Sequence, residues 1–88
     1  MKYDLRKNGI FFFEQEDLNS DPVLSHVAKQ LGVTKGGLEV EAESAEAALA
    51  KLFGENWQDL PEEICPSLRV AENGYWSDLY EITPETSW

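Results

Sequence analysis

The segment LEVEAESAEAALAKLFGENW, residues 38–57, contains the clearest strand and the clearest helix of this 88-residue chain. Apolar residues alternate with glutamates over 38–42, and this period of two predicts a strand with one apolar and one acidic face. Ser44 is a favourable N-cap, and apolar residues then recur at helical spacing, which predicts a helix over 44–53. Gly54 is placed to end this helix in the left-handed conformation.

An Asn-Gly pair near the start of the chain predicts a hairpin, because both residue types tolerate positive φ. The pair, Asn8 and Gly9, lies between the predicted strands 2–6 and 10–14. A two-residue turn would place Leu5 opposite Phe12. The run of three phenylalanines in the second strand would put aromatic bulk on both faces of the sheet, so either both faces are partly covered or one of them is a binding surface.

A second Asn-Gly pair, at 73–74, predicts another hairpin between strands 68–71 and 75–82. The sequence is compatible with two registers for this hairpin. A two-residue loop pairs Leu68 with Leu79, whereas a three-residue loop pairs Val70 with Trp76. Residues 83–88 are expected to form a tail.

A further helix is expected to begin at Pro22, with Asp21 or Ser20 as its cap, and to end at Gly32. Residues 15–20, before this helix, have the composition of a polar loop. The predicted element order is therefore β-β-α-β-α-β-β, within a single domain spanning 1–88. The fold class is α+β, a mainly antiparallel sheet with two helices packed on one face.

Charge narrows the choice of partner. The net charge is −10, from 17 acidic and 7 basic residues, and after Lys51 the only base is Arg69. Direct binding to nucleic acid or to an acidic membrane surface requires clustered bases, so neither is expected. A basic protein surface is the expected partner. The single cysteine, Cys65, and the absence of a signal-like or membrane-spanning apolar run favour a cytoplasmic protein.

The motifs of catalysis and cofactor binding are absent from the sequence. The one histidine, His26, has no nucleophile at a suggestive spacing, and no glycine-rich phosphate loop occurs. A partial calcium-loop match at 17–21 fails, because Pro22 and Ala28 stand where the loop requires glycine and glutamate. We therefore expect no enzymatic activity, no cofactor and no metal.

The candidate partner-binding residues are acidic side chains together with one tryptophan. Glu39, Glu41 and Glu43, here called the acidic row, lie on one face of the predicted strand at intervals of about 6.6 Å, twice the strand rise. This spacing is similar to that of successive phosphates in a nucleic-acid strand. Trp57 lies among acids and is the expected aromatic anchor, whereas Trp76 and Tyr80 are expected in the core. The full set is Glu39, Glu41, Glu43, Trp57, Asp59, Glu62 and Glu63.

In size, acidity, lack of a catalytic set and surplus of aromatic residues, the chain resembles small inhibitors that mimic nucleic acid, such as the anti-CRISPR and anti-restriction proteins of phages and plasmids. The resemblance is one of composition. It implies an inhibitor that blocks a basic, nucleic-acid-handling protein. The alternative is an acidic adaptor or assembly subunit that joins a larger complex through aromatic anchors.

Overall fold

The computed structural model describes residues 1–66, 68–70 and 74–85. Its elements, in chain order, are β1 (Lys2–Lys7), α1 (Gln15–Ser20), α2 (Pro22–Leu31), β2 (Leu38–Glu41), α3 (Ala45–Phe53), the 3-10 turn η1 (Trp57–Asp59), β3 (Arg69–Val70), β4 (Tyr75–Trp76) and β5 (Tyr80–Pro84).

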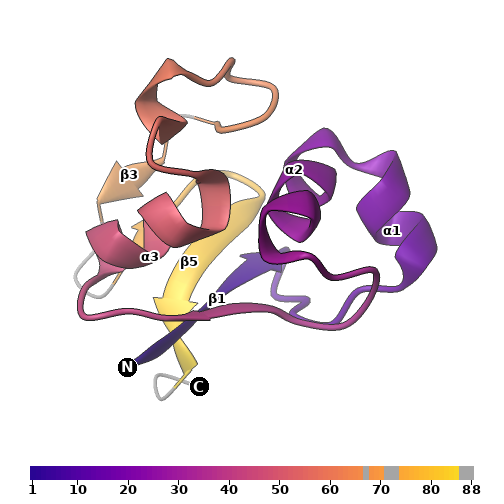
Figure 1. Cartoon of the computed structure of the whole chain (residues 1–88), viewed down its shortest axis with the longest axis horizontal. Helices are drawn as coiled ribbons and strands as arrows, with labels where there is room; N and C mark the ends of the chain where they lie inside the picture. Colours follow the sequence, from indigo (N-terminus) through magenta and orange to yellow (C-terminus); the bar gives the residue numbers. More distant parts are fainter. Residues whose placement is uncertain (67, 71–73, 86–88) are drawn as a thin grey trace.

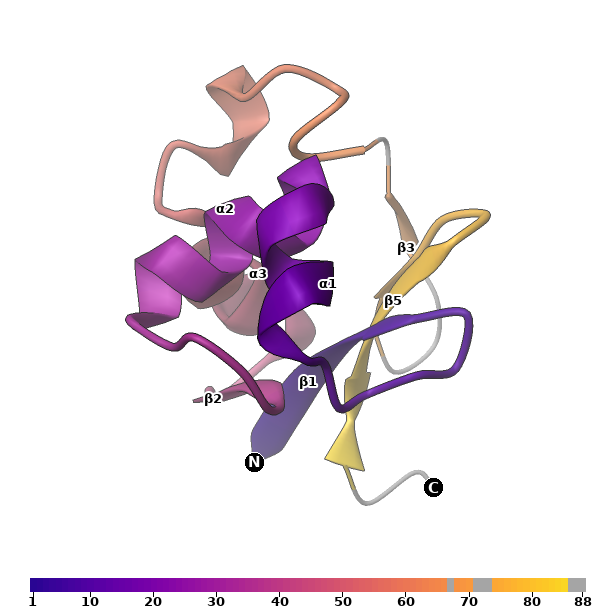
Figure 2. The same ribbon diagram turned by 90° about the vertical axis from the view of Figure 1, so that its right-hand side faces the viewer.

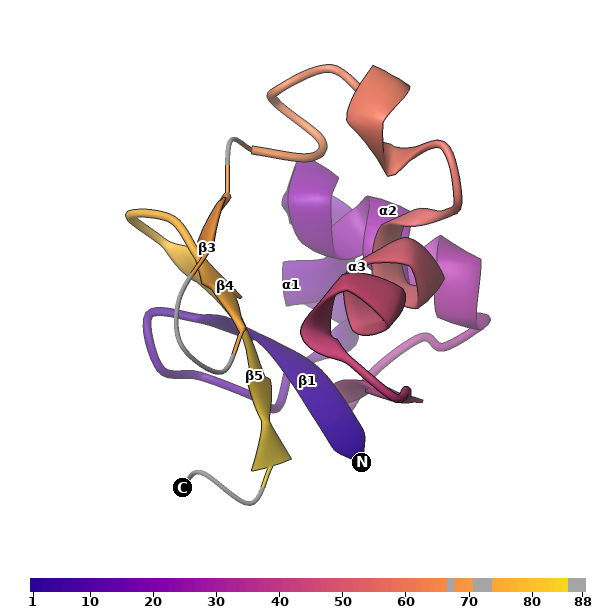
Figure 3. The ribbon, with the colours of Figure 1, turned by 90° about the vertical axis from the view of Figure 1, so that its left-hand side faces the viewer.

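The strands form one five-stranded sheet in the order β2-β1-β5-β4-β3, and every neighbouring pair is antiparallel. The helices lie on one face of this sheet, as the two side views show (Figures 2 and 3). The predicted α+β class, with an antiparallel sheet covered by helices on one face, is therefore confirmed. The central strand β5 and its neighbour β1 come from the two ends of the described chain (Figure 1).

The hydrophobic core lies between the helices and the sheet. The sheet contributes Leu5, Leu38 and Ile82, each with no exposed surface. The apolar stripes of α2 and α3 meet these side chains, since Val27 and Leu49 are equally buried. The apolar face of the sheet and the apolar stripes of the helices, which the two periodicities predict, therefore pack against each other in one core layer.

Helices α2 and α3 follow their sequence signals closely. The Asp21 carboxylate accepts from the backbone N–H groups of Val23 and Leu24, at 2.9 and 3.2 Å, and Pro22 opens α2. The Ser44 hydroxyl accepts from Ala47 N–H at 3.1 Å and caps α3. Gly54 ends α3 at φ 108° and ψ 158°, which is a positive φ but not the predicted left-handed helical conformation.

The first predicted hairpin is only half correct. Asn8 and Gly9 have φ values of 53° and 80°, and Lys7 and Ile10 exchange backbone hydrogen bonds of 3.0 and 2.9 Å across the predicted turn. The predicted strand 10–14 does not form, because β2 occupies the edge of β1 that it would need, and Leu5 pairs with Leu38 instead of Phe12.

Residues 15–20 form helix α1 and not the predicted loop. Leu18 is 2% exposed and anchors this short helix in the core. The Asp17 carboxylate accepts from the Glu14 N–H at 3.2 Å and satisfies one amide at its start. One buried leucine and one cap thus suffice to order a segment whose composition is polar.

The predicted strand 75–82 is divided into β4 and β5 by a turn at 77–80. Ser77 N–H donates to the Tyr80 carbonyl at 2.7 Å, and Tyr80 N–H donates to the Ser77 hydroxyl at 3.1 Å. Strand β5 then continues through Thr83 and Pro84, so the predicted tail does not begin at residue 83.

Neither predicted register of the 68–82 hairpin is correct, because Val70 pairs with Tyr75. Asn73 lies outside the described residues, as do 86–88. Gly74 lies so close to β5 that a Cβ at this position would sit 1.9 Å from the Ile82 carbonyl oxygen. This glycine is therefore required by a close approach between two backbone segments.

A buried carboxylate connects the helices to the sheet. Besides capping α2, Asp21 accepts from Lys7 Nζ of β1 at 2.6 Å and from the Tyr80 hydroxyl of β5 at 2.8 Å. Burial raises the pKa of Asp21, but the bonds from Lys7, Tyr80 and the α2 amides outweigh burial and hold the pKa below its ordinary value of 3.8. The ionised form is therefore the form that the fold stabilises.

We expect Asp21→Asn to lower the free energy of unfolding at neutral pH by about 1.5–3 kcal/mol, the usual contribution of buried hydrogen bonds to a charged group. Because the folded pKa is lowered, the difference from wild type should be complete above pH 3.8 and should shrink as the pH falls through the folded pKa. Urea unfolding of both proteins at several pH values measures it. Asp59→Asn, at an exposed position, is the control, and a difference that does not change on acidification would contradict this account.

Candidate protein-binding surfaces

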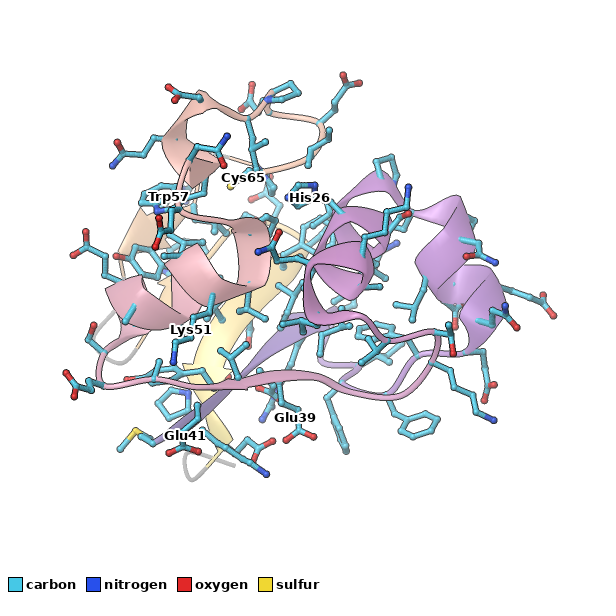
Figure 4. All side chains as sticks on the ribbon, in the orientation of Figure 1. His26, Glu39, Glu41, Lys51, Trp57 and Cys65 are labelled. Atoms are coloured by element: carbon cyan, nitrogen blue, oxygen red, sulfur yellow. The ribbon has the colours of Figure 1, made fainter. Side chains whose placement is uncertain are left out.

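The acidic row lies at one edge of the sheet. Glu39 and Glu41 are in β2 and Glu43 follows it; all three are exposed, whereas the alternate residues Leu38 and Ala42 are buried and Val40 is half-buried. The predicted division into an acidic and an apolar face is therefore confirmed for this segment. In Figure 4, the side chains of Glu39 and Glu41 point away from the helices.

Two cations of the β1 end lie beside the acidic row. Lys2 Nζ is 3.9 Å from a Glu39 carboxylate oxygen, and the ammonium group of Met1 is 2.9 Å from Glu41. The Met1 ammonium lowers the pKa of Glu41 by hydrogen bonding and by charge attraction. All four groups are exposed, and exposed ion pairs contribute about 0–1 kcal/mol, so a partner's cations can replace these contacts at small cost.

The other acidic candidates lie elsewhere. Asp59, Glu62 and Glu63 are exposed in η1 and the loop that follows it. This segment lies above the helices in Figure 1, at the end of the molecule opposite to the segment that contains β2. The seven candidate residues therefore do not form one continuous surface, and the acidic row is the group that the fold orders most regularly.

Trp57 is half-buried and packs against the core. It borders an open cavity of about 440 Å³ between α3, η1 and β4, which is also lined by Leu49, Cys65 and Tyr75. Burial raises the pKa of the Cys65 thiol, so this cysteine behaves as a small apolar residue with its proton retained. Figure 4 shows Trp57 and Cys65 at the same end of the molecule.

Among the described residues, the most exposed aromatic side chains do not include Trp57, the expected anchor. Phe11 and Phe12 are 44% and 58% exposed in the segment that follows the first turn, and Trp76 is 38% exposed on β4. The prediction that Trp76 is a core residue is therefore wrong, whereas Tyr80, at 8% exposure, is confirmed in the core. The run of three phenylalanines was the sequence signal for this surface, since only Phe13 is buried.

Charged and aromatic groups are also placed on the face of the sheet that carries no helix. Arg69 lies 4.6 Å from the Trp76 ring centre on neighbouring strands, and Arg6 lies 5.9 Å from the Phe11 ring centre. Arg6 also donates to Asp4 at 3.3 Å, and Asp4 is 2% exposed. Burial raises the pKa of Asp4, although the Arg6 charge opposes that rise. This face thus includes a partly buried ion pair beside exposed rings.

His26 has a structural contact. Its Nε2 lies 2.7 Å from the Phe53 carbonyl oxygen, and since a carbonyl only accepts, this nitrogen carries the proton. The bond satisfies a carbonyl at the end of α3. Among the residues that the structure describes, no three His, Cys, Asp or Glu side chains are grouped so as to hold a metal ion.

No helix within the described ranges is both long and apolar enough to cross a membrane. Comparisons with protein-family models, with curated proteins and with solved structures gave no match to this chain.

Substituting alanine at each of two tryptophans should separate a packing role from a surface role. We expect Trp57→Ala to lower the free energy of unfolding by about 1–3 kcal/mol, because it removes a half-buried ring from the core. Trp76→Ala should cost less than about 1 kcal/mol, the value of an exposed cation–π contact such as that with Arg69. Chemical denaturation of both variants measures this, and equal losses would contradict the assignment.

Proposed function

We propose that this protein is a small acidic inhibitor that binds a basic, nucleic-acid-handling protein and occupies part of its nucleic-acid site. The observation that supports this best is the acidic row, in which Glu39 and Glu41 lie on β2 at the spacing of alternate strand residues and Glu43 follows directly. A rigid array of negative charge presents the electrostatic pattern that a phosphate-binding cleft recognises. The net charge of −10 would also accelerate encounter with a basic surface.

The arrangement of the cations supports the same proposal. Lys2 and the Met1 ammonium are exposed and flank the acidic row at its β1 side, and Lys51 of α3 lies at the end of its outer side, where it donates to the Glu41 carbonyl oxygen. Lysine and arginine side chains of a partner would reach Glu39 and Glu41 from solvent. Weak exposed ion pairs would then be exchanged for new ones, with little net cost of desolvation.

A second candidate function is that of an acidic adaptor that joins a larger assembly through aromatic anchors. The exposure of Phe11, Phe12 and Trp76 favours it, because aromatic residues are over-represented at the energetic centres of interfaces. Such binding would depend on apolar burial and much less on charge.

The two functions differ in their response to salt. The immobilised protein would be used to capture partners from a bacterial lysate, which would then be eluted with a salt gradient. An inhibitor of the proposed kind should release its partner at moderate salt, and duplex DNA or RNA should compete with it for that partner.

The decisive variant replaces Glu39, Glu41 and Glu43 with glutamine. We expect this triple variant to associate with the recovered partner more slowly than wild type and with a flatter salt dependence, because surface charges act mainly on the association rate. Surface-based kinetics at two salt concentrations measures both quantities. Unchanged kinetics for the triple variant, together with loss of binding in a Phe11→Ser, Phe12→Ser variant, would establish the adaptor function instead.

A further inference from the structure

We propose that the partner contributes an extended basic segment, which binds by adding a strand to the outer edge of β2. This inference rests on the proposed function and specifies the partner structure that the acidic row recognises. β2 is the first strand in the order β2-β1-β5-β4-β3, so among the residues that the structure describes it has a neighbouring strand on one side only. In Figure 2, no helix or strand of the described part of the chain lies beyond β2 on its other side.

The hydrogen-bond pattern identifies which backbone groups of β2 point outward. Ala42 N–H donates to the Met1 carbonyl at 2.9 Å, and the Met1 ammonium donates to the Ala42 carbonyl at 3.1 Å. In an antiparallel pair, residues alternate between bonding the neighbouring strand and pointing away from it. The backbone N–H and C=O groups of Leu38 and Val40 therefore point to β1, as those of Ala42 do. The backbone N–H and C=O groups of Glu39 and Glu41 point to the free edge.

One of these outward groups already has a partner from within the chain. Lys51 Nζ, from α3, donates to the Glu41 carbonyl oxygen, and Figure 4 shows Lys51 above this strand. A lysine placed on a sheet edge is a common protection against pairing with other chains. The Glu39 N–H and C=O groups and the Glu41 N–H would bond the added strand, whose end would lie before Lys51.

Charge decides which chain can occupy the edge. Glu39 and Glu41 project on one side of β2 at about 6.6 Å, and alternate residues of an added strand have the same spacing. Lysine or arginine at alternate positions would therefore lie beside both carboxylates, while the intervening residues would lie on the side of half-buried Val40. A second copy of this chain would instead bring like charges together across the edge, on two molecules of net charge −10 each.

The test uses a short synthetic peptide of alternating lysine and valine, with a block-ordered peptide of the same composition as its control. Binding to the 15N-labelled protein would be followed by NMR titration at low salt. We expect the alternating peptide to bind more tightly than the block-ordered one and to shift the Glu39 and Glu41 amide signals. Hydrogen exchange at these two amides should slow on binding, because they become bonded to the added strand.

Two substitutions at Glu39 separate the backbone contribution from the charge. Glu39→Pro removes the outward N–H and is compatible with an edge strand, so it should weaken the alternating peptide by about tenfold or more. Glu39→Gln keeps the N–H and should weaken binding less, with a flatter salt dependence. Glu16→Gln, at an exposed acid in α1, should bind like wild type.

Each outcome decides the question. Strand addition is overturned if Glu39→Pro binds the alternating peptide as wild type does, or if both peptides bind equally. Absence of binding by either peptide also overturns it. The proposed inhibitor function is tested separately by the lysate experiment. Circular dichroism checks the fold of Glu39→Pro. Should that variant not fold, a peptide with backbone N-methyl groups on the pairing edge makes the same test, and unchanged affinity for it would overturn the proposal.

Discussion

The Asp21 carboxylate connects the two layers of this small protein. It caps α2, accepts from Lys7 at the end of β1 and accepts from the Tyr80 hydroxyl at the start of β5. These bonds come from three separate segments, so each depends on the correct placement of the other two. Among the described carboxylates, Asp21 is one of two that are buried, and it is held in its ionised form.

The buried and the exposed acidic residues differ in what determines the stability of their charged form. The pKa of buried Asp4 is raised because burial outweighs the attraction of Arg6, whereas that of Asp21 is lowered because its hydrogen bonds outweigh burial. Glu39 and Glu41 are exposed to solvent, where long-range attraction is retained, and Glu39 lies close enough to Glu85 to raise the pKa of that carboxyl through a hydrogen bond and charge repulsion. The excess negative charge is therefore displayed on the surface and contributes little to holding the fold together.

Local signals in the sequence predicted the local structure well. The strand at 38–42, the caps at Asp21 and Ser44, the apolar stripes of α2 and α3 and the first Asn-Gly turn are all decided within a few residues. The errors occur where distant segments compete. Strand 10–14 fails because β2 takes its place beside β1, a choice that no local pattern reveals. The exposure of the acidic row was predictable from period two, but the separation of Glu39 from Glu62 and Glu63 follows only from the three-dimensional path of the chain.

The pairing of β1 with the central strand β5 affects how the chain reaches this structure. Their pairing joins Tyr3 to Pro84 and Lys7 to Tyr80, contacts of the largest sequence separation available here. A chain emerging from the ribosome can form α2 and α3 early, but β1 has its central neighbour only after residues 80–84 have emerged. Completion of the sheet is thus a late, non-local event, and such contacts slow folding because the loop entropy is lost before they form. Until β5 pairs with β1, the apolar side chains of Tyr3 and Leu5 are only partly covered. The high negative charge of the chain opposes association between such incompletely folded molecules.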